Sequence, residues 1–212
     1  MTKQSRLLFS IPYFIWLLLF VVTPLGMIFY KSFFDINGQV TLGNYTNYFA
    51  SGNYLEMTFN SVWYAFLVTL VTLLVSYPTA LFLSRTKHKQ LWLLLIILPT
   101  WVNLLLKAYA FIGIFSQTGT VNNFLSLFGL APQEFLFTDF SFLTVAAYIE
   151  LPFMILPIFN SIEELPSSLI AASRDLGATK WDTFRRVIFP LTMSGVRSGV
   201  QAVFIPSLSL FM

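Results

Sequence analysis

Long apolar runs dominate this chain, and almost no polar face of helical period interrupts them. Crossing a bilayer as a helix takes about 20 apolar residues. The lack of a polar face argues against the alternative of a soluble protein with buried core helices. We therefore expect an all-α polytopic membrane protein with one membrane domain over residues 1–212. The predicted spans are residues 7–30, 60–83, 91–115, 142–159 and 193–212.

The composition supports this interpretation. Charged residues make up 10% of the chain, against about 25% in soluble domains. Lys3 and Arg6 precede the first run, as in a signal peptide, but the run is too long and no small-residue cleavage site follows it. Without cysteine, the chain has no disulfide, thiol nucleophile or cysteine metal site. His88 lies alone in a basic loop, so we expect no metal site and no cofactor.

Basic residues gather in every second connection between the runs. Cytoplasmic loops of membrane proteins collect Lys and Arg, so the N-terminus, the turn near residue 85 and residues 160–192 are predicted to lie inside. The basic residues are spread over three short segments, which argues against a nucleic-acid interface. They are Lys3, Arg6, Arg85, Lys87, Lys89, Arg174, Lys180, Arg185, Arg186 and Arg197.

Two outer segments connect the remaining spans. Residues 31–59 contain several Gly-Asn and Asn-Gly turn signals and are expected to form a small folded segment. Residues 116–139 are expected to contain a short helix around residues 121–128. No phosphate-binding G-x-x-x-x-G-K-[ST] loop occurs, so ATP hydrolysis by that route is not expected of this chain.

The longest charged stretch lies in the inner loop, residues 160–192. Ser167 suits a helix N-cap, and a short helix is predicted from there to Leu176. Gly177 then supplies the backbone freedom of a helix-terminating turn. A polar segment folded in this way between two membrane spans must face water, and it suggests that another protein docks there.

A second short helix is predicted after the glycine, because Thr179 and Asp182 have capping-box spacing. It is expected to present Trp181, Phe184 and Ile188 on one side. One interpretation is an amphipathic loop that packs on lipid headgroups. The other is a docking element whose apolar side chains enter a groove of a soluble partner.

These residues resemble the cytoplasmic signature of ABC importer permeases: Glu-Ala-Ala, three residues, Gly, nine residues, then Ile-x-Leu-Pro. Ala172 matches the first alanine, while Ala171 stands in place of the glutamate and Ser173 in place of the second alanine. The resemblance implies docking on cytoplasmic ABC ATPase subunits. The residues assigned to the docking loop are Ala172, Arg174, Asp175, Leu176, Gly177, Ala178, Trp181, Phe184 and Pro190.

Further sequences look like the B-type permease of spermidine/putrescine importers: LPTW at residues 98–101, KAYA at 107–110, LPFMILP at 151–157 and PLT at 190–192. The resemblance covers essentially the whole chain. It implies a type I ABC importer permease-like helical bundle in a bacterial inner membrane, with about five of six expected spans present and the C-terminal part truncated.

The resemblance also implies partners and a substrate. The partners are a second permease subunit, the ATPase subunits, an extracytoplasmic substrate-binding protein and membrane lipid, and the substrate is a polyamine. Two alternatives stay open. One is the same type of importer for sulfate, iron or an opine, and the other is an ion-coupled secondary transporter.

Glu150 is the one acidic residue inside an apolar run, and an intramembrane carboxylate marks a transport pathway or a buried pair. At roughly 1.5 Å per residue it lies near the bilayer midplane. Trp101 is expected at a similar depth, and a carboxylate with an aromatic face suits an alkylammonium substrate. Tyr148 is the third expected contact. The alternatives are an ion pair between Glu150 and Lys107, a structural hydrogen bond of Glu150, and simple packing of Trp101.

Overall fold

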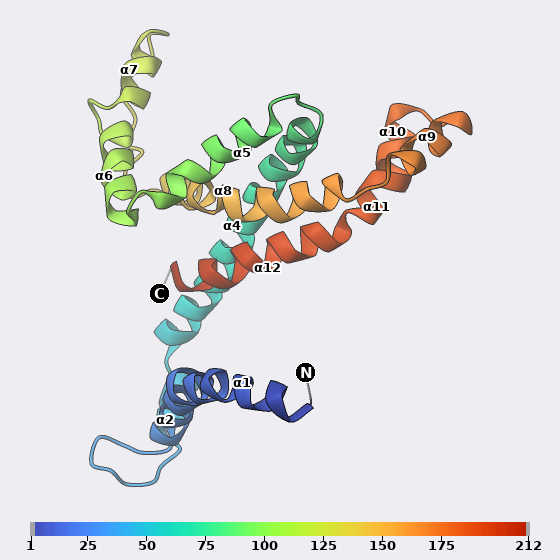
Figure 1. The fold of residues 1–212 in the computed structure, drawn as a ribbon. Coiled ribbons are helices and arrows are strands. Elements are labelled where there is room, and N and C mark those ends of the chain that lie inside the picture. Colours follow the sequence, from blue (N-terminus) through green and yellow to red (C-terminus); the bar gives the residue numbers. More distant parts are fainter. Residues whose placement is uncertain (1–2, 211–212) are drawn as a thin grey trace. The chain divides into compact units, whose positions relative to one another are not determined.

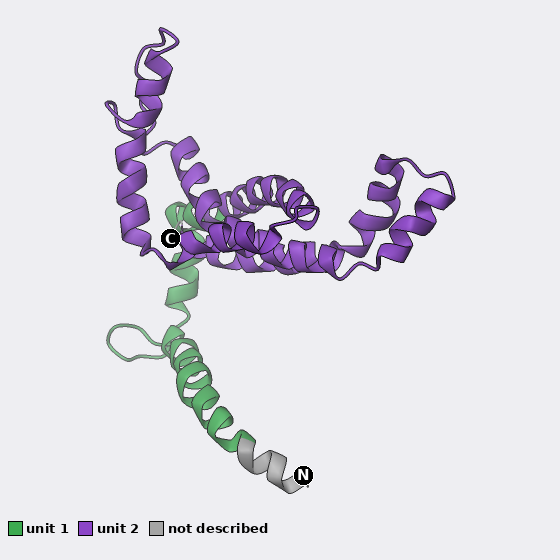
Figure 2. Ribbon diagram, turned by 45° about the horizontal axis from the view of Figure 1, so that its top comes forward, with its two compact units in different colours: residues 1–59 green, residues 60–212 purple. Residues whose placement is uncertain are grey.

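The computed structural model describes the chain from residue 3 to residue 210, and its side chains from residue 10 (Figure 1). The side chains of Lys3 and Arg6 and the end of the predicted fifth span therefore lie outside the described residues. Within the described part no strand forms, and one isolated antiparallel bridge joins Phe34 to Val40. The chain divides into two compact units, residues 1–59 and 60–212 (Figure 2).

The first unit is built on one long helical stretch and a small folded segment. The stretch consists of α1 (Lys3–Leu17), the π-helical η1 (Leu18–Val22) and α2 (Thr23–Ser32). The amide of Thr23 donates to the carbonyl of Leu18, five residues back, and Pro24 follows with no amide to donate. The segment after α2 contains α3 (Gly43–Ala50).

The second unit contains the remaining helices. The first of them, α4, begins before the boundary between the units at residue 60. The elements are α4 (Gly52–Ser84), α5 (Lys89–Ile97), η2 (Leu98–Trp101), α6 (Leu104–Phe115), α7 (Thr120–Ser126), α8 (Asp139–Glu163), α9 (Ser167–Asp175), α10 (Lys180–Thr183), η3 (Phe184–Ile188), α11 (Phe189–Leu191) and α12 (Met193–Leu210).

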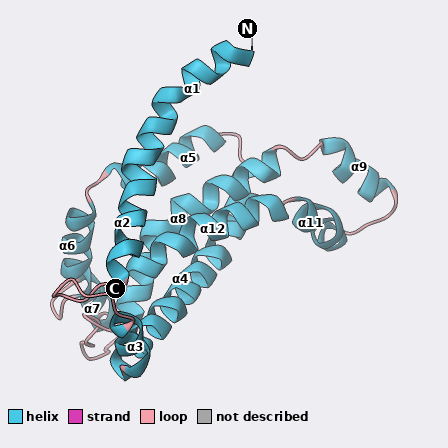
Figure 3. Cartoon of the chain, turned by 90° about the horizontal axis from the view of Figure 1, so that it is seen from below, coloured by secondary structure: helices cyan, strands magenta, loops and turns pink. Residues whose placement is uncertain are grey.

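Helices α8 and α12 lie side by side and form the centre of the second unit (Figures 1 and 3). A Cβ added to Gly195 would lie 2.5 Å from the carbonyl oxygen of Pro157, and one added to Gly199 would lie 2.7 Å from the sulfur of Met154. The contact moves back along α8 as the chain advances along α12, so the two helices are antiparallel. Small residues that let helix backbones approach closely are the usual basis of packing within a bilayer.

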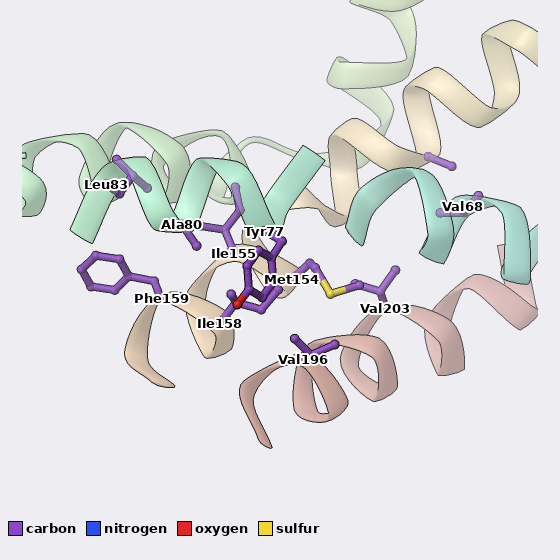
Figure 4. Packing of buried hydrophobic residues seen from close by; sticks show 11 residues of the cluster. Val68, Tyr77, Ala80, Leu83, Met154, Ile155, Ile158, Phe159, Val196 and Val203 are labelled. Carbon is purple, nitrogen blue, oxygen red and sulfur yellow. The ribbon is translucent and has the colours of Figure 1, made fainter. Parts of the chain in front are cut away.

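Helix α4 packs its small and apolar residues against this pair. Tyr77 and Ala80 of α4 belong to the same buried cluster as Ile158 of α8 and Val196 of α12 (Figure 4). Met154 is fully buried in that cluster and its side chain points toward Val203 of α12. The inner loop leaves one end of the α8–α12 pair, while α6 and α7 lie at the opposite end (Figure 1).

The predicted all-α class is confirmed. Four helical segments of the described chain are long and apolar enough to cross a membrane, and a fifth is present if the helices before and after Thr192 are counted as one bent span. The bend between Lys180–Leu191 and Met193–Leu210 is 59°. The limits of the individual spans stay predictions.

The predicted third span is not one continuous helix. After η2, Val102 is extended (φ −76°, ψ 135°), and α6 starts at Leu104 with the side chain of Asn103 accepting from the amide of Leu105 at 2.8 Å. Pro99 has no amide, which weakens the turn before this break. By contrast, α8 continues as a helix through both of its prolines.

Two local predictions meet different outcomes. The short helix in the second outer segment is confirmed as α7. Ser167 is not an N-cap: it is the first residue of α9, the cap position is Pro166, and no side chain caps this helix end. Pro166 is extended (ψ 125°) and has no side-chain acceptor, so the first amides of α9 have no side-chain cap.

Candidate functional site

The inner loop is organised by the turn at Gly177. This glycine has φ +82°, a conformation that residues with a Cβ rarely adopt, as its predicted role requires. The amide of Gly177 donates to the carbonyl of Arg174 at 2.9 Å, and the amide of Ala178 donates to that of Ser173 at 3.1 Å. This pair of bonds is a Schellman motif, which satisfies the last carbonyls of α9.

The predicted capping box at the start of α10 is confirmed. The hydroxyl of Thr179 accepts from the amide of Asp182 at 3.1 Å, and the Asp182 carboxylate accepts from the amide of Thr179 at 3.3 Å. The hydrogen bond from the Thr179 hydroxyl, with the one from its amide, lowers the pKa of the Asp182 carboxyl. Asp182 therefore stays ionised near neutral pH, and its negative charge stabilises the N-terminus of this helix through the helix dipole.

A hydrogen bond that was not predicted joins the two short helices. The hydroxyls of Ser173 in α9 and Thr183 in α10 lie 3.0 Å apart, and Thr183 is buried. In the comparison with the family signature, Ser173 was notable only because it replaces the second alanine. Its hydroxyl instead fixes the angle between the two arms of the loop, which is a role that alanine cannot fill.

The apolar side predicted for the second helix does not face outward as a whole. Ile188 is buried in the chain, and the ring of Phe184 packs against Tyr77 of α4 with centroids 5.9 Å apart. Trp181 stacks on Phe184 at 5.3 Å but stays 66% exposed. Leu176, beside the glycine turn, is 89% exposed. Leu176 and Trp181 are therefore the most exposed large apolar side chains of the described loop.

The second arm does not end at Pro190. The chain passes through η3, where the amide of Phe189 donates to the carbonyl of Phe184, and α11 continues to Leu191. Pro190 cannot donate to the carbonyl of Arg186, and this π-type register avoids a helix that would need the bond. The same arrangement of a π-segment followed by a proline occurs at η1 and Pro24.

In the membrane part, Glu150 is buried in α8, with 6% of its surface exposed. Lys107 of α6 lies close enough for its charge to attract the carboxylate. Within residues 3–210 the two do not come within the 4.0 Å of an ion pair, and Glu150 has no hydrogen bond to another side chain. Glu150 is therefore a buried acid with a nearby but unbound counter-charge.

Within the described residues, the other two predicted pathway residues make their contacts elsewhere or stay exposed. The ring of Tyr148 packs edge-on against Phe111 of α6, with centroids 5.1 Å apart, and residues two positions apart on a helix point in different directions. Trp101 lies at the end of η2, is 78% exposed, and forms no ring contact within the described chain. The break after η2, which hydropathy does not reveal, places this indole outside the packed core.

Comparisons with known proteins decide the family. The model of the family "binding-protein-dependent transport system inner membrane component" matches residues 48–212. The chain belongs to this family. It is an inner-membrane component of a transport system, and its several apolar helices agree with that placement.

Individual relatives agree with this assignment. The spermidine/putrescine transport system permease protein PotB of Escherichia coli K12 is 39% identical over 92% of this chain and 74% of its own length. PotB of Haemophilus influenzae is 36% identical over 93% of this chain and 72% of its own. A crystal structure of a bacterial ABC transporter that imports the polysaccharide alginate is similar in fold, with a TM-score of 0.74, 20% identity, and coverage of 89% of this chain and 68% of that chain. The predicted type I ABC permease fold is thereby confirmed.

Proposed function

We propose that this permease chain forms part of the translocation pathway of an ATP-driven importer for polyamines such as spermidine and putrescine. The observation that carries the proposal is its 36–39% identity to the PotB permeases over more than nine tenths of the chain. Such identity over nearly the whole chain favours a shared substrate class over sulfate, iron or an opine.

The buried carboxylate of Glu150 supports a cationic substrate. Burying an ionised carboxylate without a partner is costly, so the site favours a compensating positive charge. Lys107 provides that charge at a distance when the pathway is empty. A substrate ammonium group would take over this role on binding. Trp101 has an exposed indole that could form a cation–π contact with an alkylammonium group. Tyr148 lies between α8 and α6, the helices that carry Glu150 and Lys107.

The inner loop is proposed as the contact with a cytoplasmic ATPase. Leu176 and Trp181 project from the glycine turn and the start of α10, which is the arrangement of apolar anchors that helix-in-groove recognition uses. Arg174 and Asp175 flank these anchors at the exposed rim. The chain would then depend on that ATPase for energy, since its sequence has no phosphate-binding loop of its own.

The remaining partners and the orientation follow from the same proposal. A second permease subunit would complete the pathway, and an extracytoplasmic binding protein would deliver the polyamine. The N-terminus and the inner loop would lie in the cytoplasm, because the basic residues collect there.

Uptake by the assembled system tests the substrate. The chain is co-expressed with the ATPase, second permease and binding protein of its importer in a host that lacks polyamine import, and uptake of labelled spermidine is measured at limiting concentration. We expect competition by putrescine and none by sulfate, ferric iron or an opine. Uptake that a protonophore abolishes at constant ATP would identify an ion-coupled carrier instead and overturn the proposal.

A further inference from the structure

A hollow separate from the proposed pathway residues lies where the inner loop meets the ends of the membrane helices. It has a volume of about 460 Å³ and is enclosed by the end of α4, the end of α8 and both arms of the loop. This volume is in the range of sites that hold small ligands. All of its walls belong to the second unit of the chain.

The hollow carries uncompensated positive charge. Arg85, Arg174 and Lys180 reach it from three different elements. Within residues 3–210 none of the three forms an ion pair. The acid of the lining, Glu163, is already bound to Lys89.

The loop's own acids do not neutralise these charges. Asp182 is engaged by the capping box with Thr179 and lies 3.9 Å from Arg186, and it is not part of the lining. Three cations that converge on one hollow, whose lining acid Glu163 is paired with Lys89 instead, are an anion-binding arrangement. The buried hydroxyl of Thr183 adds a polar group to the same wall.

The other half of the lining is apolar, and it comes from the ends of two membrane helices as well as from the loop. Leu81 lies in the last turn of α4, Ile162 in the last turn of α8 and Ile188 at the end of η3. An apolar lining does not stabilise a free inorganic anion. It does stabilise a phospholipid, because the phosphate contacts the cations while the glycerol and first acyl carbons contact the apolar side chains.

We propose that this hollow binds the phosphate headgroup of an anionic phospholipid from the cytoplasmic leaflet. The argument rests on charge complementarity and on the position of the hollow at the ends of two membrane-crossing helices, where lipid headgroups lie. Basic pockets between membrane helices on the cytoplasmic side bind such headgroups. The proposal rests on the inward orientation of the loop, but not on the substrate of the importer.

A bound lipid at this place would tie the two arms of the loop to the membrane helices. Arg174 belongs to the last turn of α9, Lys180 to the first turn of α10 and Arg85 to the turn after α4. One phosphate held between them would join three elements that share no ion pair. The anionic lipid is therefore expected to stiffen the segment through which the ATPase acts.

Lipid binding is tested on the assembled transporter, delipidated and then placed in nanodiscs of phosphatidylcholine with increasing phosphatidylglycerol. Retained lipid is counted by native mass spectrometry after release from the discs. The variant Arg85→Gln/Arg174→Gln/Lys180→Gln should hold phosphatidylglycerol roughly a hundredfold more weakly, since it removes three cations from the hollow and each is worth about a factor of five. The matched control Lys87→Gln/Arg185→Gln/Arg186→Gln removes the same charge from the same face outside the hollow, and it should bind as the parent does.

Further arms separate the possible results. The variant Arg85→Lys/Arg174→Lys keeps the charge and should keep the lipid, which guards against simple misfolding of the glutamine variant. Equal loss in the test and control variants would show general surface attraction and overturn the proposal. Displacement of the lipid by millimolar inorganic phosphate would assign the hollow to a soluble anion. Unchanged lipid with lost ATPase co-purification would assign the three cations to the ATPase, while failure of the inward orientation would be seen independently by thiol labelling at position 180.

Discussion

The phenol oxygen of Tyr77 in α4 lies 2.8 Å from the hydroxyl oxygen of Thr192, the residue at which the inner loop bends into α12. Thr192 is fully buried, and its hydroxyl lies 2.9 Å from the carbonyl oxygen of Ile188, to which it donates. Tyr77 is then the donor in the bond between the two hydroxyls. A membrane helix 115 residues earlier in the chain therefore holds the hinge of the loop.

Tyr77→Phe should loosen that hinge without emptying the space that the ring fills. Loss of one buried hydrogen bond destabilises a protein by about 1 kcal/mol, and we expect a lower melting temperature and ATP hydrolysis that is less dependent on substrate. Ser194→Ala is the control, because its bond to Ser161 at 3.2 Å lies at an exposed position. If both changes have equal effects on the melting temperature and on the substrate dependence of ATP hydrolysis, the Tyr77–Thr192 bond does not hold the hinge.

The two glycines of α12 should differ in their tolerance of alanine. A Cβ at Gly195 meets the carbonyl oxygen of Pro157 at 2.5 Å, which is rigid backbone, whereas one at Gly199 first meets the movable sulfur of Met154 at 2.7 Å. Overpacking of this kind destabilises by about 1–3 kcal/mol. Gly195→Ala should therefore lower the melting temperature more than Gly199→Ala, and the reverse order in detergent unfolding would contradict the helix contact described here.

Gly177→Val should break the loop while leaving the membrane helices inserted. A β-branched residue at φ +82° is strained, although nothing lies within 4 Å of the added Cβ, so the effect comes from the backbone alone. ATPase co-purification and uptake should both fall. Gly177→Asn is the control, since asparagine tolerates this conformation and should keep most of both. A valine variant that retains its ATPase as firmly as the parent would refute the docking role of the turn.

Orientation can be read from single cysteines, because the chain has none. We expect a membrane-impermeant thiol reagent to label Asn44→Cys and Gln133→Cys in intact cells. His88→Cys and Lys180→Cys should react only after the cells are opened. Labelling of position 180 in intact cells would reverse the topology and place the loop outside.

Glu150→Gln should reduce uptake at limiting spermidine by roughly ten- to hundredfold, the range of a charge-assisted contact worth about 1.5–3 kcal/mol. Glutamine keeps the shape and removes the charge, so assembly with the ATPase should survive. If Glu150 served only to balance Lys107, the change would instead lower yield and assembly, and adding Lys107→Met would rescue them. Parent-level uptake by Glu150→Gln would exclude a binding role.

Local features of the loop could be predicted from the sequence because their signals lie within a few residues of each other. Gly177 forms its turn, and Thr179 and Asp182 form their capping box, through hydrogen bonds with residues next to them in the chain. The break at Asn103 could not be predicted from hydropathy, since the residues around it are as apolar as those of a continuous span. Its signal was local chemistry: a proline followed four residues later by an asparagine that caps a helix.

Tertiary pairings were the part that sequence could not supply. Phe184 and Ile188 pack inward, and Phe184 does so against α4, which lies about a hundred residues earlier in the chain. Helical periodicity alone assigned both side chains to an outer face. The same holds for Tyr77 with Thr192, and for Trp101, whose high exposure follows from the break after η2. Spacing along one helix gives the direction of a side chain but not what lies opposite it.

The close contact of α8 and α12 has a mechanical consequence. Both ends of the inner loop are anchored in this one pair of helices, and at Gly195 the backbones are too close for one helix to slide past a side chain of the other. A push on the loop therefore cannot be absorbed by shear between its two anchors. The pair must swing as a single lever, so that a displacement at the glycine turn reappears at the far ends of both helices.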